Sequence, residues 1–461
     1  MRRIRHIKLI TLGTIFFASL FFILVKYGSV DTHPRLLLKW KHEGVFANCK
    51  IINKELFATK IILIDGNKKI DMDLIKVNEK TGNILSEKMI FEENYETEKY
   101  IDFSSGFFKH RFRNSDILID KNTIYATIEI GRDYDPKNFY KKFLWSVIAC
   151  DLNDQQIKWR FNKEDSGTTP DVSYGNLKFV NSKKILFTAL DDSMTPPKCQ
   201  LYLLDEINGN IVWQAKESIG YILGKPAIYN NIYVTSQEVT KKIAGKYEYA
   251  SYANSIDSNT GKSLWKVKIS EDGIAQYASP QVASGRMYIL TGLADTATLH
   301  CLSADNGKIL WKKKVPYAER IFLYPEDKTI YIAQTGIIAY DMYTGRLKKK
   351  YLGLYGEVYQ IARIDNIIIN NNGSGSLEVF DKRTGRLLQM IGVLKKDIEW
   401  QLKQYDNKGI RYKLLFRKVR NLFNKPNGIL ETPVAKNILA TNDMAYTYGD
   451  KGIFAYEIKN N

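Results

Sequence analysis

The sequence predicts an all-β fold: an eight-bladed β-propeller of four-stranded blades, preceded by one transmembrane helix and carrying a short helical insertion in the last blade region. Three observations predict it. A hairpin motif recurs along most of the chain, the N-terminus is basic and then apolar, and one interval between motif copies is unusually long. Repeats spaced by roughly 40–50 residues are typical of propellers and other repeat folds.

The recurring motif is an apolar run that ends in Asp, with Gly four residues later and Trp eight residues later. Clear copies are LYLLDEINGNIVW at 201–213 and SIDSNTGKSLW at 255–265. The Asp carboxylate can accept backbone N–H groups at the head of a turn, and Gly tolerates the left-handed conformation that closes a short hairpin. The Trp ring needs a partner surface that a lone hairpin lacks, so neighbouring copies must stack.

A second strand pair precedes several copies, as in GKPAIYNNIYVTS and SPQVASGRMYILTG, so each repeat contains about four strands, as a propeller blade does. No long helical period separates the copies, which disfavours parallel βαβ units. Eight positions mark the copies: Asn78, Asp151, Asp205, Asp257, Ser303, Asp341, Asp381 and Glu457.

The last copy lacks a Trp-bearing strand, and LLLKW at 36–40 can supply it. We therefore predict that Leu36–Trp40 pairs with Ile453–Ile458 and closes the ring, because closure removes exposed sheet edges. Some copies are degenerate. Gln155 replaces the Gly of its copy, and the Trp is lost after Asn78, Asp341 and Asp381.

The N-terminus predicts a membrane anchor. Residues 1–8 form a basic tip, and Leu9 to Val25 are 17 consecutive uncharged, mostly apolar residues, which is long enough to span a bilayer as a helix. The basic tip should remain in the cytoplasm, so a linker at 26–35 would lead to a propeller at 36–461 outside it. A cleaved signal peptide is the alternative, but its apolar core is usually shorter and no small-residue cleavage site follows.

Net charge and cysteine content say less about the function than the N-terminal segment and the repeat motif do. The net charge of +18 combines the basic tip, a basic stretch at 395–425 and scattered lysines, and anionic lipid, a wall polymer or an acidic protein could each exploit it. The cysteines and histidines show no metal-ligand spacing, and buried thiols are favoured over disulfides. The four cysteines are Cys49, Cys150, Cys199 and Cys301.

The irregular segment at 392–428 predicts a basic amphipathic helix over about 410–423. Apolar residues recur there with helical spacing, and basic residues occupy the other faces. The apolar residues are Tyr412, Leu415, Phe416, Val419, Leu422 and Phe423. The helix either packs on its own propeller or binds a membrane surface or a partner. Two further stretches, FEENYETEKY at 91–100 and GRDYDPKNFYKKF at 131–143, are expected to be loops on one face of the ring.

The motif resembles the PQQ-like (quinoprotein dehydrogenase-like) propeller repeat, with SIDSNTGKSLW and YDMYTGR as close matches over about residues 36–461. The resemblance implies the fold more than an activity, since the family includes quinone- and calcium-dependent dehydrogenases and also non-catalytic members. One non-catalytic member is the propeller lipoprotein of the outer-membrane barrel assembly machinery, and this branch is the more similar.

No adjacent Cys-Cys pair of the kind that quinoprotein dehydrogenases carry is present, and Asp191-Asp192 is more simply a loop. We therefore expect no catalytic, cofactor-binding or metal-binding residues and no cofactor. The expected function is a membrane-anchored, extracytoplasmic protein-binding or envelope-scaffolding module, with an envelope protein or cell-wall polymer as partner and no nucleic acid. A quinone- and calcium-dependent dehydrogenase and a carbohydrate-binding protein are the alternatives.

Overall fold

The computed structural model describes residues 35–459 except for 53, 65–68, 95–116, 121, 132–142, 152–155, 163–167, 170–176, 182, 192–197, 216–220, 223, 244–245, 272–278, 293–295, 317, 319, 335, 354–357, 373–375, 393–428, 431–436 and 450–451. The predicted anchor at 9–25 and the predicted helix at 410–423 lie outside the described residues. Among the residues that are described, no helix is long and apolar enough to cross a membrane.

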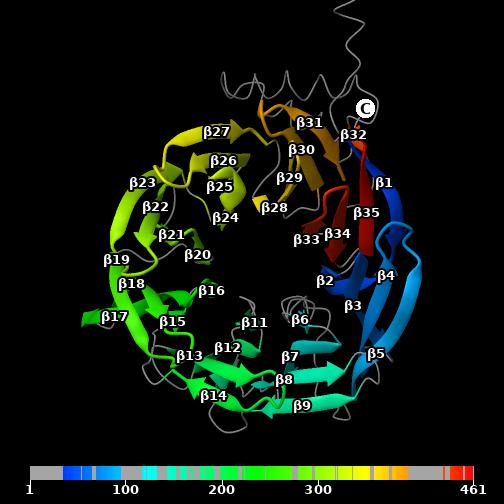
Figure 1. Cartoon of the computed structure of the whole chain (residues 1–461), viewed down its shortest axis with the longest axis horizontal. Helices are drawn as coiled ribbons and strands as arrows, with labels where there is room; N and C mark the ends of the chain where they lie inside the picture. Colours follow the sequence, from blue (N-terminus) through cyan, green and yellow to red (C-terminus); the bar gives the residue numbers. More distant parts are fainter. Residues whose placement is uncertain are drawn as a thin grey trace, which may run out of the picture.

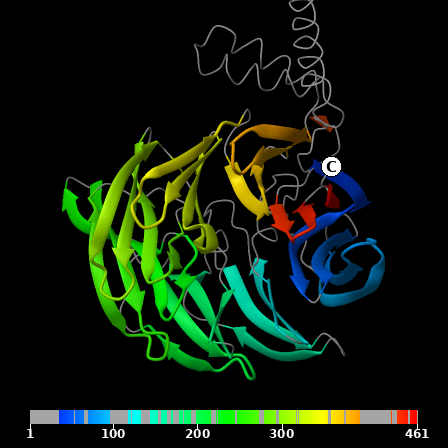
Figure 2. The ribbon, with the colours of Figure 1, turned by 45° about the horizontal axis from the view of Figure 1, so that its top comes forward.

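The described strands form eight separate sheets arranged as blades around a ring, which confirms the predicted eight-bladed propeller (Figure 1). All described strand pairs are antiparallel except β31 with β32, which is parallel. The first strand of each blade lies near the centre of the ring and the fourth lies toward the outside, with β32 added beyond the fourth strand of blade 7 (Figure 1). A view tilted by 45° shows the blades following one another around the ring (Figure 2).

The first four blades follow the chain in order. Blade 1 contains β2 (Val45–Ile52), β3 (Glu55–Ile64), β4 (Lys69–Asn78) and β5 (Ile84–Asn94), and blade 2 contains β6 (Ile117–Asp120), β7 (Thr123–Gly131), β8 (Phe143–Asp151) and β9 (Ile157–Asn162). Blade 3 contains β10 (Thr168–Thr169), β11 (Leu177–Val180), β12 (Lys184–Asp191), β13 (Lys198–Asp205) and β14 (Ile211–Gln214). Blade 4 contains β15 (Tyr221–Ile222), β16 (Ala227–Ile228), β17 (Ile232–Ile243), β18 (Lys246–Ile256) and β19 (Ser263–Ser270).

The last four blades complete the ring. Blade 5 contains β20 (Gln281–Ala283), β21 (Arg286–Thr291), β22 (Thr296–Ser303) and β23 (Ile309–Pro316), and blade 6 contains β24 (Arg320–Tyr324), the 3-10 turn η3 (Pro325–Asp327), β25 (Thr329–Gln334), β26 (Gly336–Asp341) and β27 (Leu347–Tyr351). Blade 7 contains β28 (Val358–Ile364), β29 (Ile367–Asn372), β30 (Ser376–Asp381), β31 (Leu387–Ile391) and β32 (Ile429–Leu430). Blade 8 contains β33 (Asn437–Ala440), β34 (Met444–Gly449), β35 (Gly452–Lys459) and β1 (Arg35–His42).

The two ends of the described chain meet in blade 8, as predicted. Strand β1 pairs antiparallel with β35, with Leu36 opposite Ile458 and Trp40 opposite Ala455. The N-terminal strand therefore supplies the outermost strand of the blade that the C-terminal strands begin. The ring is closed by backbone hydrogen bonds between residues about 400 positions apart in sequence, and this pairing must offset the entropy of a very long loop closure.

The motif residues explain how a blade forms its outer hairpin. Asp257 accepts the backbone N–H groups of Asn259 and Thr260 at 3.0 and 2.7 Å, and its carboxylate also accepts the Thr260 hydroxyl at 2.9 Å. The hydrogen bonds from Thr260 lower the pKa of Asp257 below its ordinary value. Gly261 follows with φ +68°, the left-handed conformation that the turn requires.

The motif tryptophans bind successive blades together. The Nε1 of Trp213 in blade 3 donates to the carbonyl oxygen of Ser258 in blade 4 at 3.2 Å, and a Cβ added to Gly261 would lie 2.6 Å from the Trp213 ring. The same arrangement joins Trp40 to Gly82, Trp159 to Gly209 and Trp265 to Gly307. Glycine is therefore needed at this position for two reasons: its backbone conformation, and the close approach of the ring from the preceding blade.

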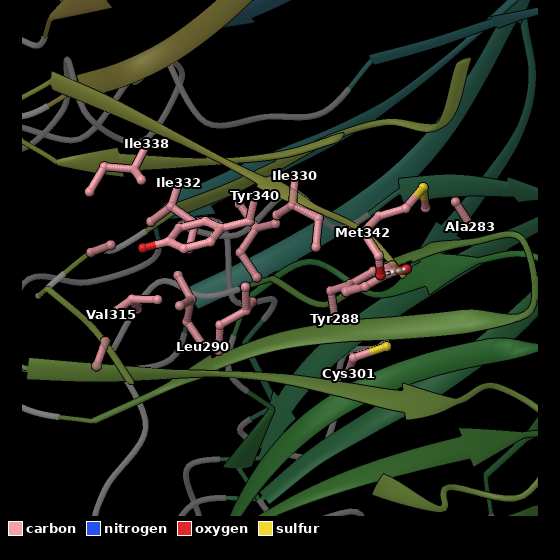
Figure 3. Packing of buried hydrophobic residues seen from close by; sticks show 14 residues of the cluster. Ala283, Tyr288, Leu290, Cys301, Val315, Ile330, Ile332, Ile338, Tyr340 and Met342 are labelled. Carbon is pink, nitrogen blue, oxygen red and sulfur yellow. Dashed lines mark hydrogen bonds between the residues drawn. The ribbon is translucent and has the colours of Figure 1, made fainter. Parts of the chain in front are cut away.

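Buried aliphatic and aromatic residues fill the interfaces between blades. Figure 3 shows one such cluster, in which Tyr288 and Leu290 of β21 and Cys301 of β22 pack against Ile330 and Ile332 of β25 in the next blade. Successive residues of a middle strand face the two neighbouring blades in turn, so nearly every residue of strands such as β21 and β30 is buried. Sheet-on-sheet packing of this kind supplies most of the apolar area that stabilises the ring.

The degenerate motif copies lie where the docking arrangement is absent or altered. Ser86 stands at the Trp position of blade 1, and the next blade has Gln155 where the accepting Gly would be. In blade 6, Lys349 replaces the Trp, and the hydroxyl of Tyr351 donates instead to the carbonyl oxygen of Lys382 at 2.8 Å. Where a blade lacks the Trp, either the next blade lacks the Gly that would receive it, or another side chain donates the hydrogen bond in its place.

Blade 7 has Gln389 at the Trp position because blade 8 has no motif turn to receive a ring. The Gln389 side-chain amide accepts a hydrogen bond from the Leu36 N–H at 2.9 Å and donates one to the Leu36 carbonyl at 3.0 Å. Gln389 and Leu36 are both fully buried. At the same interface between blades 7 and 8, the Gln360 side chain accepts a hydrogen bond from the Ile438 N–H at 2.5 Å. Gln389 therefore binds the backbone of the closing strand where that strand begins.

Substitution of Gly261 by Ala tests the docking arrangement. We expect a loss of about 2–4 kcal/mol in the free energy of unfolding, since both the left-handed φ and the contact with Trp213 are unfavourable for a Cβ. The matched control is Gly285→Ala, where φ is +71° but no atom lies within 4 Å of the added Cβ, and the loss should be only about 1–2 kcal/mol. Equal losses in urea denaturation would contradict the docking role.

Substitution of Gln389 by Met tests the closure of the ring. The change removes both hydrogen bonds to Leu36 while approximately keeping side-chain volume, and leaves buried backbone groups unpaired, so the free energy of unfolding should fall by about 2–4 kcal/mol. Gln214→Met, at an exposed position of β14, is the control and should change stability by less than about 0.5 kcal/mol. A near-neutral Gln389→Met would show that the hydrogen bonds from Gln389 contribute little to holding β1.

Candidate functional site

The two faces of the ring differ in the length of the connections that they carry. One face, here called the tight-turn face, bears the connections from first to second and from third to fourth strands, which contain two to six residues each. The opposite face, here called the loop face, bears the connections from second to third strands and from each blade to the next. Short turns leave little freedom for variation, whereas longer connections on a rigid scaffold commonly carry binding residues.

All the longest connections join strand ends at the loop face. They are 95–116 between β5 and β6, 132–142 between β7 and β8, 163–176 around β10, 271–280 between β19 and β20, and 392–428 between β31 and β32. They include most of both predicted loop stretches and the segment of the predicted helix at 410–423, although these residues themselves lie outside the described part. The loop face is the candidate functional surface because the longest connections all begin and end there.

The described N-terminus enters the ring at the tight-turn face. Strand β1 is an outermost strand, and such strands run from the tight-turn face to the loop face, so Arg35 lies at the tight-turn end opposite Lys459. The segment 1–34 therefore joins the propeller on the face opposite to the long connections.

The described residues do not provide the groups that a quinone and calcium centre would need. Among them, no group of three or more His, Cys, Asp or Glu residues could hold a metal ion. All four cysteines are free thiols, each in a different blade, and Cys150, Cys199 and Cys301 are buried. Burial raises the pKa of Cys150 to about 11, which disfavours the reactive thiolate form. The described residues therefore do not fit the cofactor of the quinoprotein dehydrogenases.

A buried polar cluster in blade 7 was not predicted from the sequence. Asn370 and Glu378 are fully buried, and the Asn370 amide donates to the Glu378 carboxylate at 2.9 Å. Asn372 and Ser376 form a second buried hydrogen-bonded pair two rungs further along the same two strands. The cluster lies beside Gly353, where an added Cβ would contact Glu378. The run of three asparagines at 370–372 was the available signal, and it was overlooked because it interrupts no motif copy.

His300 is the one buried histidine among the described residues. It lies in β22 with 4% of its surface exposed, and its Nε2 is 2.8 Å from the Thr291 hydroxyl oxygen. Burial, and to a smaller extent the nearby positive charge of Lys312, lower the pKa of His300 from 6.5 to about 4. His300 is consequently neutral at neutral pH and has no geometry suited to proton transfer with a substrate.

Comparisons with known proteins agree on the fold and diverge on activity. A family model described as outer membrane protein assembly factor BamB matches residues 250–406. The crystal structure of BamB from Moraxella catarrhalis is similar with a TM-score of 0.51 and 10% identity, covering 92% of this chain and all of that one. The quinohemoprotein alcohol dehydrogenase from Comamonas testosteroni gives 0.53 and 11%, covering 92% of this chain and 76% of that one.

A curated relative is more similar over a shorter region. The tetrathionate hydrolase of Acidithiobacillus ferrooxidans is 31% identical over 118 residues, which span 26% of this chain and 20% of that protein. The match thus covers only a small part of the hydrolase. At the identities of the two solved structures, similarity demonstrates the fold alone.

The pH dependence of stability should reveal the buried neutral His300. Because its folded pKa of about 4 lies below the ordinary 6.5, the unfolded chain binds the proton first as the pH falls. The contribution to the free energy of unfolding is complete above about pH 6.5 and should decrease by about 3 kcal/mol as the pH falls to about 4. His300→Gln should remove that portion of the pH dependence in urea denaturation. Parallel curves for the two proteins would contradict this assignment.

Proposed function

Because the chain is a propeller of the PQQ-like repeat family, we propose that it is a non-catalytic, membrane-anchored module that presents its loop face to an envelope protein outside the cytoplasm. Residues 9–25 would form the anchor, with the basic tip at 1–8 in the cytoplasm and the linker at 26–35 leading to the propeller. The similarity to an outer membrane protein assembly factor supports a role in protein interaction or scaffolding.

The opposition of the two faces is the observation that carries this proposal. The N-terminal segment joins the ring at the tight-turn face, and the longest connections all join strand ends at the loop face. A membrane segment attached to the first face would leave the second face directed away from the bilayer. The connections at 95–116 and 392–428 would then be available to a partner, and the basic segment at 410–423 would face that partner rather than the anchoring membrane.

A dehydrogenase is the second candidate function, and the structural similarity to quinoprotein enzymes is the observation in its favour. The described residues nevertheless supply no cluster of metal ligands, and the sequence has no adjacent pair of cysteines. A rigid propeller can be retained for its surface after a catalytic centre is lost, since the fold depends on inter-blade docking and not on a cofactor.

Site-specific photo-crosslinking in intact cells tests the proposed orientation. A photoreactive residue in place of Glu271, which lies on the loop face with 85% of its side chain exposed, should give a protein adduct of defined mass. The matched control is a photoreactive residue in place of Asn208, which is exposed on the tight-turn face and should give no such adduct. Adducts formed from Asn208 alone would contradict the orientation.

The purified protein can be assayed for the alternative dehydrogenase activity. A red-shifted absorption band that appears after addition of quinone and Ca²⁺, together with alcohol oxidation, would overturn the non-catalytic assignment even if the crosslinks form.

A further inference from the structure

Lysines are concentrated on the outermost strands of three neighbouring blades. The strands β19 (SLWKVKIS), β23 (ILWKKKVP) and β27 (LKKKY) contain eight lysines and no Asp or Glu. These strands lie side by side on the outer wall of the ring (Figure 1). The surface formed by Lys266, Lys268, Lys312–Lys314 and Lys348–Lys350 is called the lysine rim below.

The middle of the lysine rim has no counter-charge. At one end, Lys266 and Lys268 form ion pairs with Glu238 at 2.6 Å and Glu271 at 3.0 Å. Lys312, Lys313, Lys314 and Lys350 are exposed, and within the described structure their ammonium groups form no hydrogen bond or ion pair. The positive charge of Lys312 also acts on the interior, because it contributes to the lowered pKa of His300.

Lysines of the rim recur at equivalent positions of successive blades. Lys266, Lys312 and Lys350 each lie nine residues after the first motif position, so they occupy equivalent positions on three successive blades. Lys312 and Lys314 lie on the same side of β23, with Cα atoms roughly 7 Å apart. Like charges at such spacing repel one another, so an anion bound along this row would relieve an unfavourable interaction.

Protection of exposed strand edges does not account for this density. Edge lysines hinder pairing with other sheets. Strand β14 is also an outermost strand, and its sequence IVWQ has no charged residue although Ile211 and Val212 are about half exposed. The ring therefore tolerates an uncharged outer strand, and the excess of lysine in β23 and β27 needs another explanation.

We propose that the lysine rim binds a flexible polymer that carries a phosphate group in each repeat unit. Ammonium groups on flexible stems suit phosphate as point charges and do not need a fixed bidentate geometry. The rim extends over three blades of a convex ring, so a flat bilayer could touch it at only one blade at a time, whereas a flexible chain can follow it. Binding here is independent of the loop face and would not compete with a protein partner bound there.

The experiment titrates the full chain with fluorescently labelled long-chain inorganic polyphosphate, measuring anisotropy at several salt concentrations. The triple variant Lys312→Gln/Lys314→Gln/Lys350→Gln should bind at least about tenfold more weakly. The slope of log affinity against log salt should flatten by about two, as expected for three lost contacts. Arg at the same three positions should restore binding, which separates loss of charge from damage to the fold.

The matched control is Lys39→Gln/Lys41→Gln/Lys80→Gln, which removes the same charge from blades 8 and 1, where each lysine is in an exposed ion pair. Its affinity should remain within about twofold of the unmodified chain, because these lysines lie outside the lysine rim and their charges are already paired with carboxylates. Equal weakening by both triple variants would overturn the proposal, since net charge alone would then explain binding. It would also be overturned if the rim substitutions abolished binding to phosphatidylglycerol vesicles and left polyphosphate binding intact.

Discussion

The contact between a tryptophan of one blade and the glycine turn of the next is the constraint on which the ring depends. The turn must bring its Gly within contact of the incoming ring, and its carbonyl must accept the indole N–H, as Ser258 does for Trp213. Each contact therefore sets both the distance and the rotation between two blades. At the interfaces that have it, the contact fixes how two neighbouring blades are placed relative to one another, and each blade contacts mainly its two neighbours.

The closing blade cannot receive a Trp from blade 7 in this way, and its interface with blade 7 is held differently. It has no motif turn, since its outermost strand comes from the other end of the chain. Gln389 occupies the place of the missing Trp and binds the backbone of Leu36, while Trp40 of the same strand docks on Gly82 of blade 1. Strand β1 is thus held on three sides: by β35, by blade 7 and by blade 1. This arrangement concentrates long-range contacts in one short segment.

Such a scaffold separates stability from binding. The interiors of the blades and the tight turns are committed to packing, and the buried thiols and His300 belong to that packing, whereas the loop face and the outer wall are free to vary. A protein partner on the loop face and a phosphate polymer on the lysine rim would use different surfaces of one rigid body. The anchor expected at 9–25 would then determine only where that body is held, which is consistent with its attachment at the tight-turn face.

The sequence by itself determined the blade. The spacing of Asp257, Gly261 and Trp265 specifies a hairpin through local backbone conformation and side-chain capping, which is why the blade number and the pairing of 36–40 with 453–458 could be predicted. The roles of Gln389, Tyr351 and Asn370 could not be predicted, because each depends on a neighbour that is distant in sequence. The tertiary structure alone decided that the longest connections share one face opposite the N-terminal entry, and that lysines of three blades form one surface. Those facts follow from strand direction and ring order, which no local pattern encodes.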